Sequence, residues 1–152
     1  MPQPSRQRDL LDAPPTVHTQ GRRILVVDDS GVVRDVIRTF LEKAGFQVCG
    51  EAADGREAIE KAKELKPNLI VLDLSMPGMN GAEAASVLGE LMPEVPIVVL
   101  TMYGDVLGQA MAAGLGVKGV VAKAEGMTKL VECVQRLLPG NSAMVFPQKA
   151  AQ

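Results

Sequence analysis

Five short apolar runs, separated by segments of helical periodicity, organise the middle of this 152-residue chain. Four runs are rich in valine and isoleucine and are bounded by polar or turn-forming residues, which is typical of buried strands. The second run is weaker and more polar. The runs lie at residues 24–27, 48–49, 69–72, 97–100 and 117–122.

Apolar residues recur at helical spacing between these runs. Asp29 or Ser30 is suited to cap the first helix, and Gly45 to end it. Pro67 and Pro93 close the second and third helices, because proline cannot continue a helix. The fourth helix is the weakest, since glycines interrupt it. The predicted helices cover residues 33–44, 58–65, 84–91, 106–111 and 130–138.

Strands that alternate with helices predict an α/β fold with one parallel sheet, because parallel neighbours need crossover connections. The pattern is (βα) five times, so we expect a doubly wound, five-stranded parallel sheet. Residues 1–21 carry four prolines among polar residues and are expected to form a flexible N-terminal tail. Residues 22–139 form the folded domain in this prediction, and residues 140–152 form a C-terminal tail.

Composition excludes several classes of function. A formal net charge of −2 leaves no basic surface for a polyanion, so we expect no direct binding to nucleic acid. Cys49 and Cys133 lie far apart in the sequence and suggest neither a disulfide framework nor a metal site. No apolar stretch approaches the roughly 20 residues of a membrane-spanning helix. We expect no contact with membranes and a cytoplasmic location.

Polar residues follow the strong apolar runs, one group to each run. Asp28 and Asp29 follow the first, Asp73 the third and Thr101 the fourth, and Lys123 comes just after the fifth. In a parallel sheet these residues share the edge where ligands bind. Three crowded carboxylates repel one another, so positive charge is required nearby. Lys123 supplies one charge, and Mg²⁺, which prefers carboxylate, water and phosphate oxygens, is the natural second.

Each of these residues also has a simpler interpretation. An acidic pair after a strand is often a turn and a helix cap, and Thr101 or Asp73 alone would fit a cap equally well. Lys123 alone would fit an exposed loop lysine. The position of these residues along the chain favours a shared site. Unrelated polar residues would rarely fall by chance at the end of each strong apolar run.

The segments ILVVDDS, VLDLSMPGMNG, PIVVLTMYGD and GVVAK together resemble the signature segments of response-regulator receiver domains. The resemblance covers about residues 22–138. It implies a flavodoxin-like fold with strand order 2-1-3-4-5. It also implies a role in a two-component phosphorelay, in which a sensor histidine kinase or a phosphotransfer protein donates a phosphoryl group.

Carried over residue by residue, the resemblance makes Asp73 the phosphoacceptor and Asp28 with Asp29 the pair that binds Mg²⁺. Ser75 would give its backbone carbonyl to the metal. Thr101 would hydrogen-bond a phosphoryl oxygen, and Lys123 would pair with phosphorylated Asp73. The domain would catalyse only its own phosphorylation and slow dephosphorylation. Its output would be contact through the fourth helix, fifth strand and fifth helix, with a downstream protein or a second copy.

Three residues depart from the family pattern. Val120 stands where relatives carry an aromatic residue, Met102 where many have a small residue, and Ala124 where proline is frequent. The missing aromatic leaves open a pseudo-receiver that binds partners without phosphorylation. A fragment of a DNA-binding transcriptional regulator is a further alternative. A haloacid-dehalogenase-like phosphatase fits less well, because Ser75 stands where that family has a second aspartate.

Overall fold

The computed structural model describes residues 21–74, 81–102, 114 and 117–139. These residues form a single five-stranded sheet in the order β2-β1-β3-β4-β5, with every neighbouring pair parallel. The predicted strand order is therefore confirmed. The elements in chain order are β1 (Arg23–Val27), α3 (Gly31–Lys43), β2 (Gln47–Ala52), α4 (Gly55–Leu65), β3 (Leu69–Asp73), α5 (Gly81–Leu91), β4 (Ile97–Thr101), β5 (Gly119–Ala122), the short 3-10 helix η1 (Lys123–Glu125) and α7 (Met127–Leu137).

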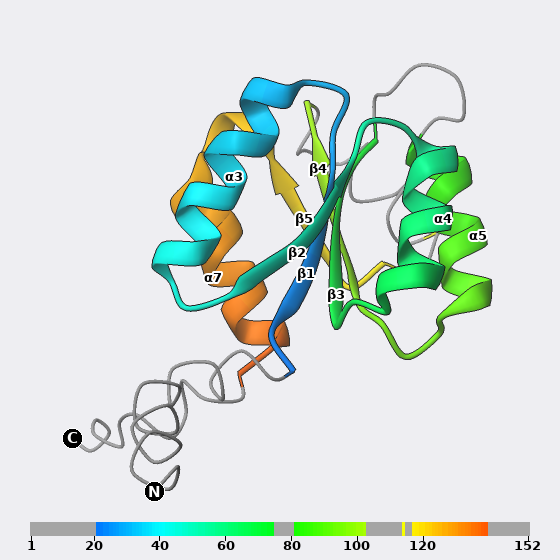
Figure 1. Cartoon of the computed structure of the whole chain (residues 1–152). Helices are drawn as coiled ribbons and strands as arrows, with labels where there is room; N and C mark the ends of the chain where they lie inside the picture. Colours follow the sequence, from blue (N-terminus) through cyan, green and yellow to red (C-terminus); the bar gives the residue numbers. More distant parts are fainter. Residues whose placement is uncertain (1–20, 75–80, 103–113, 115–116, 140–152) are drawn as a thin grey trace, which may run out of the picture.

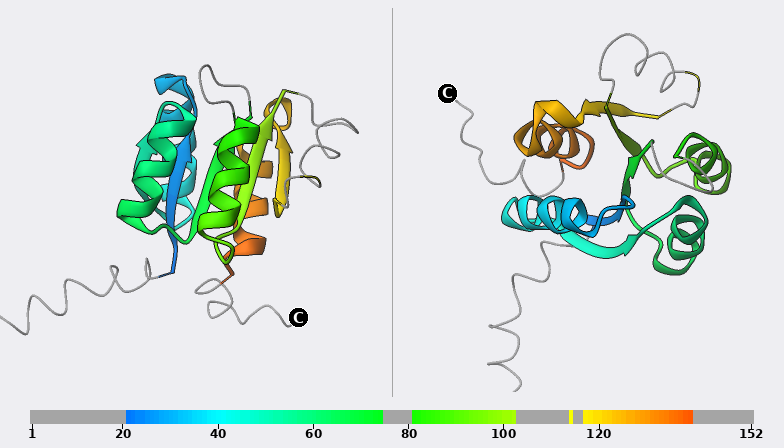
Figure 2. Two further views of the ribbon diagram at one scale, coloured as in Figure 1. Left: turned by 90° about the vertical axis from the view of Figure 1, so that its right-hand side faces the viewer. Right: turned by 90° about the horizontal axis from the view of Figure 1, so that it is seen from above.

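The helices cover both faces of the sheet (Figures 1 and 2). Helices α3 and α7 lie on one face, and α4 and α5 lie on the other. Strands β1, β3 and β4 lie inside the sheet, and nearly every one of their residues is buried, which explains their continuous apolar sequences. The expected fourth helix, residues 1–20 and 140–152 of the two predicted tails, and Ser75 lie outside the described residues.

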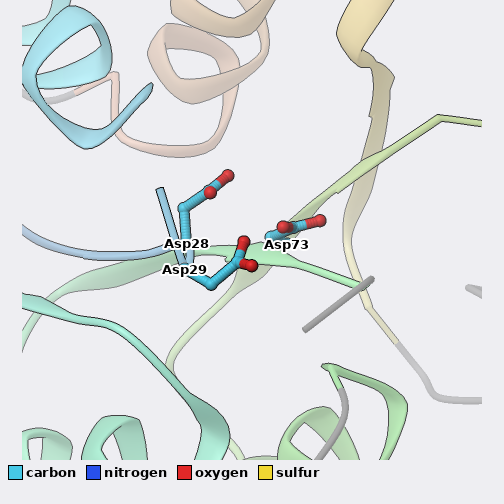
Figure 3. Close-up of side chains that lie close together, drawn as sticks. All are labelled: Asp28, Asp29 and Asp73. Atoms are coloured by element: carbon cyan, nitrogen blue, oxygen red, sulfur yellow. The ribbon is translucent and has the colours of Figure 1, made fainter. Parts of the chain in front are cut away.

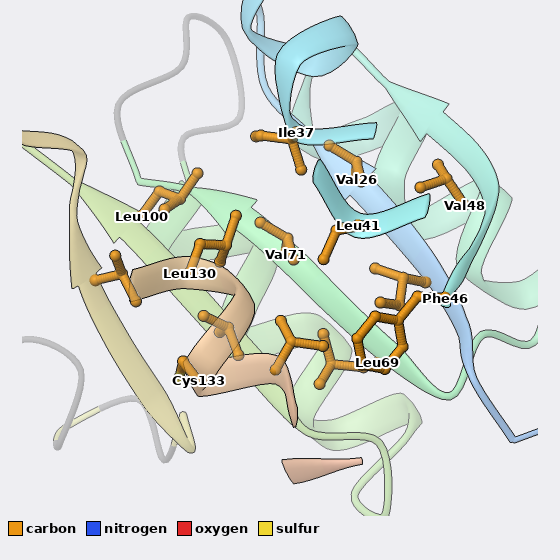
Figure 4. Packing of buried hydrophobic residues seen from close by; sticks show 14 residues of the cluster. Val26, Ile37, Leu41, Phe46, Val48, Leu69, Val71, Leu100, Leu130 and Cys133 are labelled. Carbon is orange, nitrogen blue, oxygen red and sulfur yellow. The ribbon is translucent and has the colours of Figure 1, made fainter. Parts of the chain in front are cut away.

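Two apolar clusters hold the helices to the sheet. Side chains that alternate along each strand point to opposite faces, so successive strand residues divide between the two clusters. The cluster under α3 and α7 includes Ile37, Leu41, Val71 and Leu130 (Figure 4). The cluster under α4 and α5 is built from smaller helix residues, such as Ala58 and Ala84, which let these helices approach the sheet closely.

The helix boundaries agree with the predicted capping residues. Ser30 is the N-cap of α3, and its hydroxyl accepts a hydrogen bond from the Val33 amide at 3.3 Å. Gly45 follows the helix with a φ of +96°, a conformation that glycine adopts without strain. Helix α4 stops at Leu65, two residues before Pro67. These signals end each helix at the edge of the sheet where the parallel strands begin, so that the next strand can start there.

Strand β2 is longer than its weak apolar run predicted. It spans Gln47–Ala52 and pairs with β1 from Gln47 to Ala52, with a register shift between Val48 and Gly50. Because β2 is an edge strand, several of its residues are only partly buried, and its sequence can include polar residues such as Glu51. Pairing with β1 therefore determines its extent more than its own apolar pattern does. Strand β5 is shorter than predicted and begins at Gly119.

Candidate phosphoacceptor site

The carboxyl ends of β1 and β3 bring three aspartates together (Figure 3). Carboxylate oxygens of Asp28, Asp29 and Asp73 all lie within 4.8 Å of one another. Asp28 and Asp73 are buried, whereas Asp29 is exposed. Asp28 and Asp29 follow β1 directly, and Asp73 is the last residue of β3 rather than the first after it. One edge of the cluster is therefore fixed in the sheet, and the other faces solvent.

Lys123 completes the charge arrangement from the end of β5. Its Nζ lies 3.2 Å from Asp73 Oδ2 and 3.4 Å from Asp28 Oδ2. Burial alone would lower the pKa of Lys123, but the charges of Asp73 and Asp28 outweigh it and raise this pKa above its usual value. The lysine is therefore a permanent cation at neutral pH, placed between two buried carboxylates.

Thr101 lies beside this group as the last residue of β4. Its neighbour Leu100 pairs with Asp73 in the sheet, so Thr101 is one position further toward the same edge. The threonine is buried, with 3% of its surface exposed. Ser75, the other predicted site residue, lies outside the described residues. The structure thus brings together Asp28, Asp29, Asp73, Thr101 and Lys123, as the order of the apolar runs predicted.

The chemistry of the oxygen donors fits a hard divalent cation. Three carboxylates and one ammonium group leave a net negative charge at the site, and a buried negative charge is costly unless it is compensated. Asp28 Oδ2 is buried and has no hydrogen-bond donor within the described part of the chain, apart from its ion pair with Lys123. Carboxylate oxygens that converge at this spacing suit Mg²⁺, which binds through one or two carboxylates and several waters.

The backbone around Asp28 is held by groups that sequence reasoning did not identify. The Asp28 amide donates to the Ala52 carbonyl at 3.1 Å, and the Asp28 carbonyl accepts from Arg34 Nη1 at 2.5 Å. Asp28 Oδ1 accepts from the Ser30 amide at 2.9 Å. Arg34 follows Asp28 by six residues, which places it one turn into α3. That spacing is the only signal of this contact in the sequence.

Glu51 of β2 is bound by two arginines from α3. Its Oε1 lies 2.9 Å from Arg34 Nε, and its Oε2 accepts from Arg38 Nε at 2.9 Å and from Arg38 Nη2. Burial alone would raise the pKa of Glu51, but the hydrogen bonds and charges of Arg38 and Arg34 hold it below its usual value. The Glu51 carbonyl also accepts from Lys61 Nζ of α4 at 2.9 Å.

Gly81, the first residue of α5, packs against the backbone of the acceptor strand. A Cβ at this position would overlap the Asp73 carbonyl oxygen and the Leu74 Cα. The Gly81 amide donates to the Leu74 carbonyl at 3.1 Å. The sequence suggested only turn chemistry here, but the structure shows that the absence of a side chain lets α5 start directly behind Asp73.

This fold and this site define a receiver domain. Residues 24–135 match the family model described as the response regulator receiver domain. The chain belongs to this family, which supports a role in two-component signalling.

Among curated relatives, the chain is 36% identical over 117 residues to the chemotaxis protein CheY of Thermotoga maritima, covering 77% of this chain and 98% of CheY. It is 34% identical over 131 residues to the response regulator GacA of Pseudomonas viridiflava, covering 86% of this chain but only 61% of GacA. The activity of the whole GacA protein is therefore not carried over to this chain.

Solved structures show the same fold. A LuxR-family two-component response regulator from Aurantimonas sp. SI85-9A1 superposes with a TM-score of 0.73 at 33% identity, covering 78% of this chain and 85% of that one. A CheX–CheY–BeF₃–Mg²⁺ complex from Borrelia burgdorferi gives a TM-score of 0.72 at 25% identity, covering 76% and 87%. No helix in the described ranges is both long and apolar enough to cross a membrane.

Proposed function

We propose that this chain is a phosphorylation-dependent switch that accepts a phosphoryl group on Asp73 from a phosphohistidine. The donor would be a sensor histidine kinase or a phosphotransfer protein in a cytoplasmic phosphorelay. The observation that carries the proposal is the position of Lys123, whose ammonium group faces the Asp73 and Asp28 carboxylates at 3.2 and 3.4 Å beside the exposed Asp29. A phosphoryl group bound to Asp73 would meet positive charge at this edge.

The chemical step needs a nucleophile, charge neutralisation and little else. A carboxylate oxygen of Asp73 attacks phosphorus in line with the P–N bond of the donor, and a P–O bond forms as the P–N bond breaks. The electron pair of the broken P–N bond stays on the ring nitrogen of the donor histidine. Because the other ring nitrogen carries a proton, the histidine leaves as a neutral imidazole. Lys123 moves from a carboxylate pair to a pair with the phosphoryl oxygens.

Asp28, Asp29 and Asp73, with the Ser75 carbonyl, are the residues that would hold Mg²⁺ in this proposal. When bound there, the cation would neutralise charge on the phosphoryl oxygens. Thr101, buried at the end of β4, would donate its hydroxyl proton to a phosphoryl oxygen. The reorientation of Thr101 would bias the following segment between two conformations.

The signal would then leave through the face expected from β5, α7 and the helix predicted at residues 106–111, to a downstream protein or a second copy of the chain. Val120 lies on this face, in β5, without the aromatic side chain that relatives use. A pseudo-receiver that does not depend on phosphorylation is the alternative that this position favours. On either account the chain is not an enzyme acting on external substrates in multiple turnovers.

Intact mass spectrometry after incubation with Mg²⁺ and a small acyl phosphate tests the proposal. We expect one added phosphoryl group per chain, lost in Asp73→Asn and lost on chelation of Mg²⁺. An unmodified wild-type chain would support the pseudo-receiver. Continuous release of phosphate from phosphoesters in many turnovers would instead indicate a phosphatase.

A further inference from the structure

The pair of aspartates after β1 is held by a short chain of contacts that begins at the edge strand β2. Glu51 Oε1 accepts from Arg34 Nε at 2.9 Å, and Arg34 Nη1 donates to the Asp28 carbonyl at 2.5 Å. One guanidinium group therefore bridges a carboxylate on β2 and the peptide that joins Asp28 to Asp29. The rigid, planar fork of arginine suits such a bridge, because its donors have fixed relative directions.

The carbonyl that Arg34 binds constrains the backbone between the two aspartates. It belongs to the Asp28–Asp29 peptide, so its orientation sets ψ of Asp28 and φ of Asp29. The Asp28 amide is already fixed by the Ala52 carbonyl at 3.1 Å. With both peptide groups of Asp28 hydrogen-bonded, the backbone that carries the two carboxylates is constrained before a cation binds.

Glu51 also determines where the charge of Arg34 is located. The side chains of Arg34 and Glu51 are 20% and 21% exposed, so the pair is largely removed from water. Without Glu51, the guanidinium group would be free to move toward the carboxylates of the acidic cluster and compete with a cation. Arg38, one turn further along α3, binds the other oxygen of Glu51 and does not contact the oxygen that Arg34 binds.

We propose that Arg34, tethered by Glu51, is a positioning residue that preorganises the Asp28–Asp29 peptide for binding a divalent cation. This inference rests on the proposed Mg²⁺ site. Groups that hydrogen-bond to metal ligands without touching the metal commonly matter for affinity. Their removal typically weakens metal binding by about 10- to 100-fold. Arg34 carries a positive charge, so a purely electrostatic role would have the opposite sign, because its removal would strengthen cation binding.

Arg38 provides a matched control. It lies on the same helix, carries the same charge and binds the same glutamate, but its guanidinium group contacts Glu51 and Glu42 rather than Asp28. Arg34→Met and Arg38→Met each remove one positive charge and one ion pair with Glu51. Only the first removes the contact with the Asp28 carbonyl. Any general effect of charge or stability should therefore appear in both variants.

The experiment is a Mg²⁺ titration of the full chain, followed by the amide resonances of residues 28–30 without any phosphodonor. We expect Arg34→Met to weaken Mg²⁺ binding by about tenfold or more. We expect Arg38→Met to stay within about twofold of the wild-type chain. Glu51→Gln should weaken binding, and adding it to Arg34→Met should cause no further loss, because both changes break the same chain of contacts.

A second measurement does not depend on the metal. The Ser30 amide donates to Asp28 Oδ1 at 2.9 Å, so its hydrogen exchange reports the conformation of this turn. Its protection should fall in Arg34→Met and remain unchanged in Arg38→Met. Equal effects of the two variants, or tighter Mg²⁺ binding in Arg34→Met, would overturn the positioning role. A wild-type chain that binds no Mg²⁺ would refute the proposed site, and the Ser30 exchange rates would still decide whether Arg34 positions the turn.

Discussion

The Lys123 ammonium nitrogen lies 3.2 Å from Asp73 Oδ2, and the same nitrogen lies 3.4 Å from Asp28 Oδ2. One lysine, 27% exposed, therefore compensates two carboxylates that are almost completely buried. Removal of one partner of a buried ion pair is more costly than the net value of the pair, because the remaining charge stays buried. The consequences of this arrangement can be measured without any phosphodonor.

Lys123→Met should lower the free energy of unfolding by about 2–3 kcal/mol at pH 7 in the absence of divalent cations, since two buried carboxylates lose their counter-charge. Urea denaturation measures this loss. Added Mg²⁺ should recover part of it by replacing the missing positive charge. Lys129→Met is the control, because Lys129 meets Glu132 at 3.9 Å with both side chains more than half exposed. Equal losses of unfolding free energy in the two variants would show that the buried ion pairs of Lys123 contribute no more than the exposed pair of Lys129.

Asp29→Asn should separate the stability of the domain from cation binding. Asp29 is exposed, and its carboxylate lies within 4.8 Å of oxygens of Asp28 and Asp73. Two like charges about 5 Å apart repel by about 1 kcal/mol even in a water-like dielectric. The variant should therefore melt at a higher temperature than the wild-type chain without Mg²⁺ and gain less from added Mg²⁺.

Thermal melts with and without Mg²⁺ test the Asp29 prediction. Asp35→Asn, on the exposed face of α3, is the control for a general change in charge. A lower melting temperature for Asp29→Asn without Mg²⁺ would contradict the repulsion on which the prediction rests.

Gly81→Ala should destabilise the domain and disturb the acceptor. The new Cβ would overlap the Asp73 carbonyl oxygen, so either α5 or the end of β3 must move. Overpacking of this kind costs about 1–3 kcal/mol. Gly89→Ala, in the same helix, meets nothing within 4 Å and should stabilise the domain by about 0.5–1 kcal/mol, because alanine favours helix. Urea denaturation of both variants checks the two signs, and a neutral Gly81→Ala would count against close packing behind Asp73.

Most of the site could be predicted because each of its residues ends a strongly apolar run. Asp28, Asp73, Thr101 and Lys123 follow or close apolar strands rich in valine, isoleucine and leucine, and a parallel sheet brings such positions to one edge. The strand order itself came from a family resemblance. Periodicity alone indicates that the strands are parallel but not which strands are neighbours.

The supporting residues could not be predicted, because their sequence signals have commoner meanings. Arg34 has the position of an ordinary charged residue on an amphipathic helix, and only coordinates show it reaching the Asp28 carbonyl. Glu51 lies in β2, whose extent depends on pairing with β1. Gly81 matched a turn, and its close approach to the Asp73 backbone depends on the angle at which α5 packs.

The ion pairs of Glu51 should stabilise the domain most at neutral pH and weaken in acid. The folded pKa of Glu51 lies below the usual 4.5, since the hydrogen bonds from Arg38 and Arg34 outweigh burial. A carboxylate with a depressed folded pKa contributes stability above its unfolded pKa and loses it as pH falls through the folded value. The difference in unfolding free energy between the wild-type chain and Glu51→Gln should be about 1–2 kcal/mol at pH 7.

That difference should stay constant above about pH 5 and shrink as the pH falls below 4.5. Urea titrations at several pH values measure it. Glu60→Gln, on the exposed face of α4, should remain within about 0.5 kcal/mol of the wild-type chain throughout. A Glu51→Gln difference that grows in acid would mean that the sign of the pKa shift is wrong.

Met102 is expected to lengthen the lifetime of the phosphoryl group. It directly follows Thr101, and its side chain is 63% exposed at the edge of the sheet where Asp73 lies. A large side chain there can obstruct the path of an attacking water, whereas alanine would leave that path open. Met102→Ala should therefore lose the phosphoryl group about threefold faster, which corresponds to about 0.7 kcal/mol in the activation barrier.

Leu91→Ala removes an exposed apolar side chain at the far end of α5 and should leave the lifetime of the phosphoryl group unchanged. Intact mass spectrometry, followed over time after removal of the phosphodonor, gives both rates, and an unchanged rate for Met102→Ala would refute the shielding role of Met102.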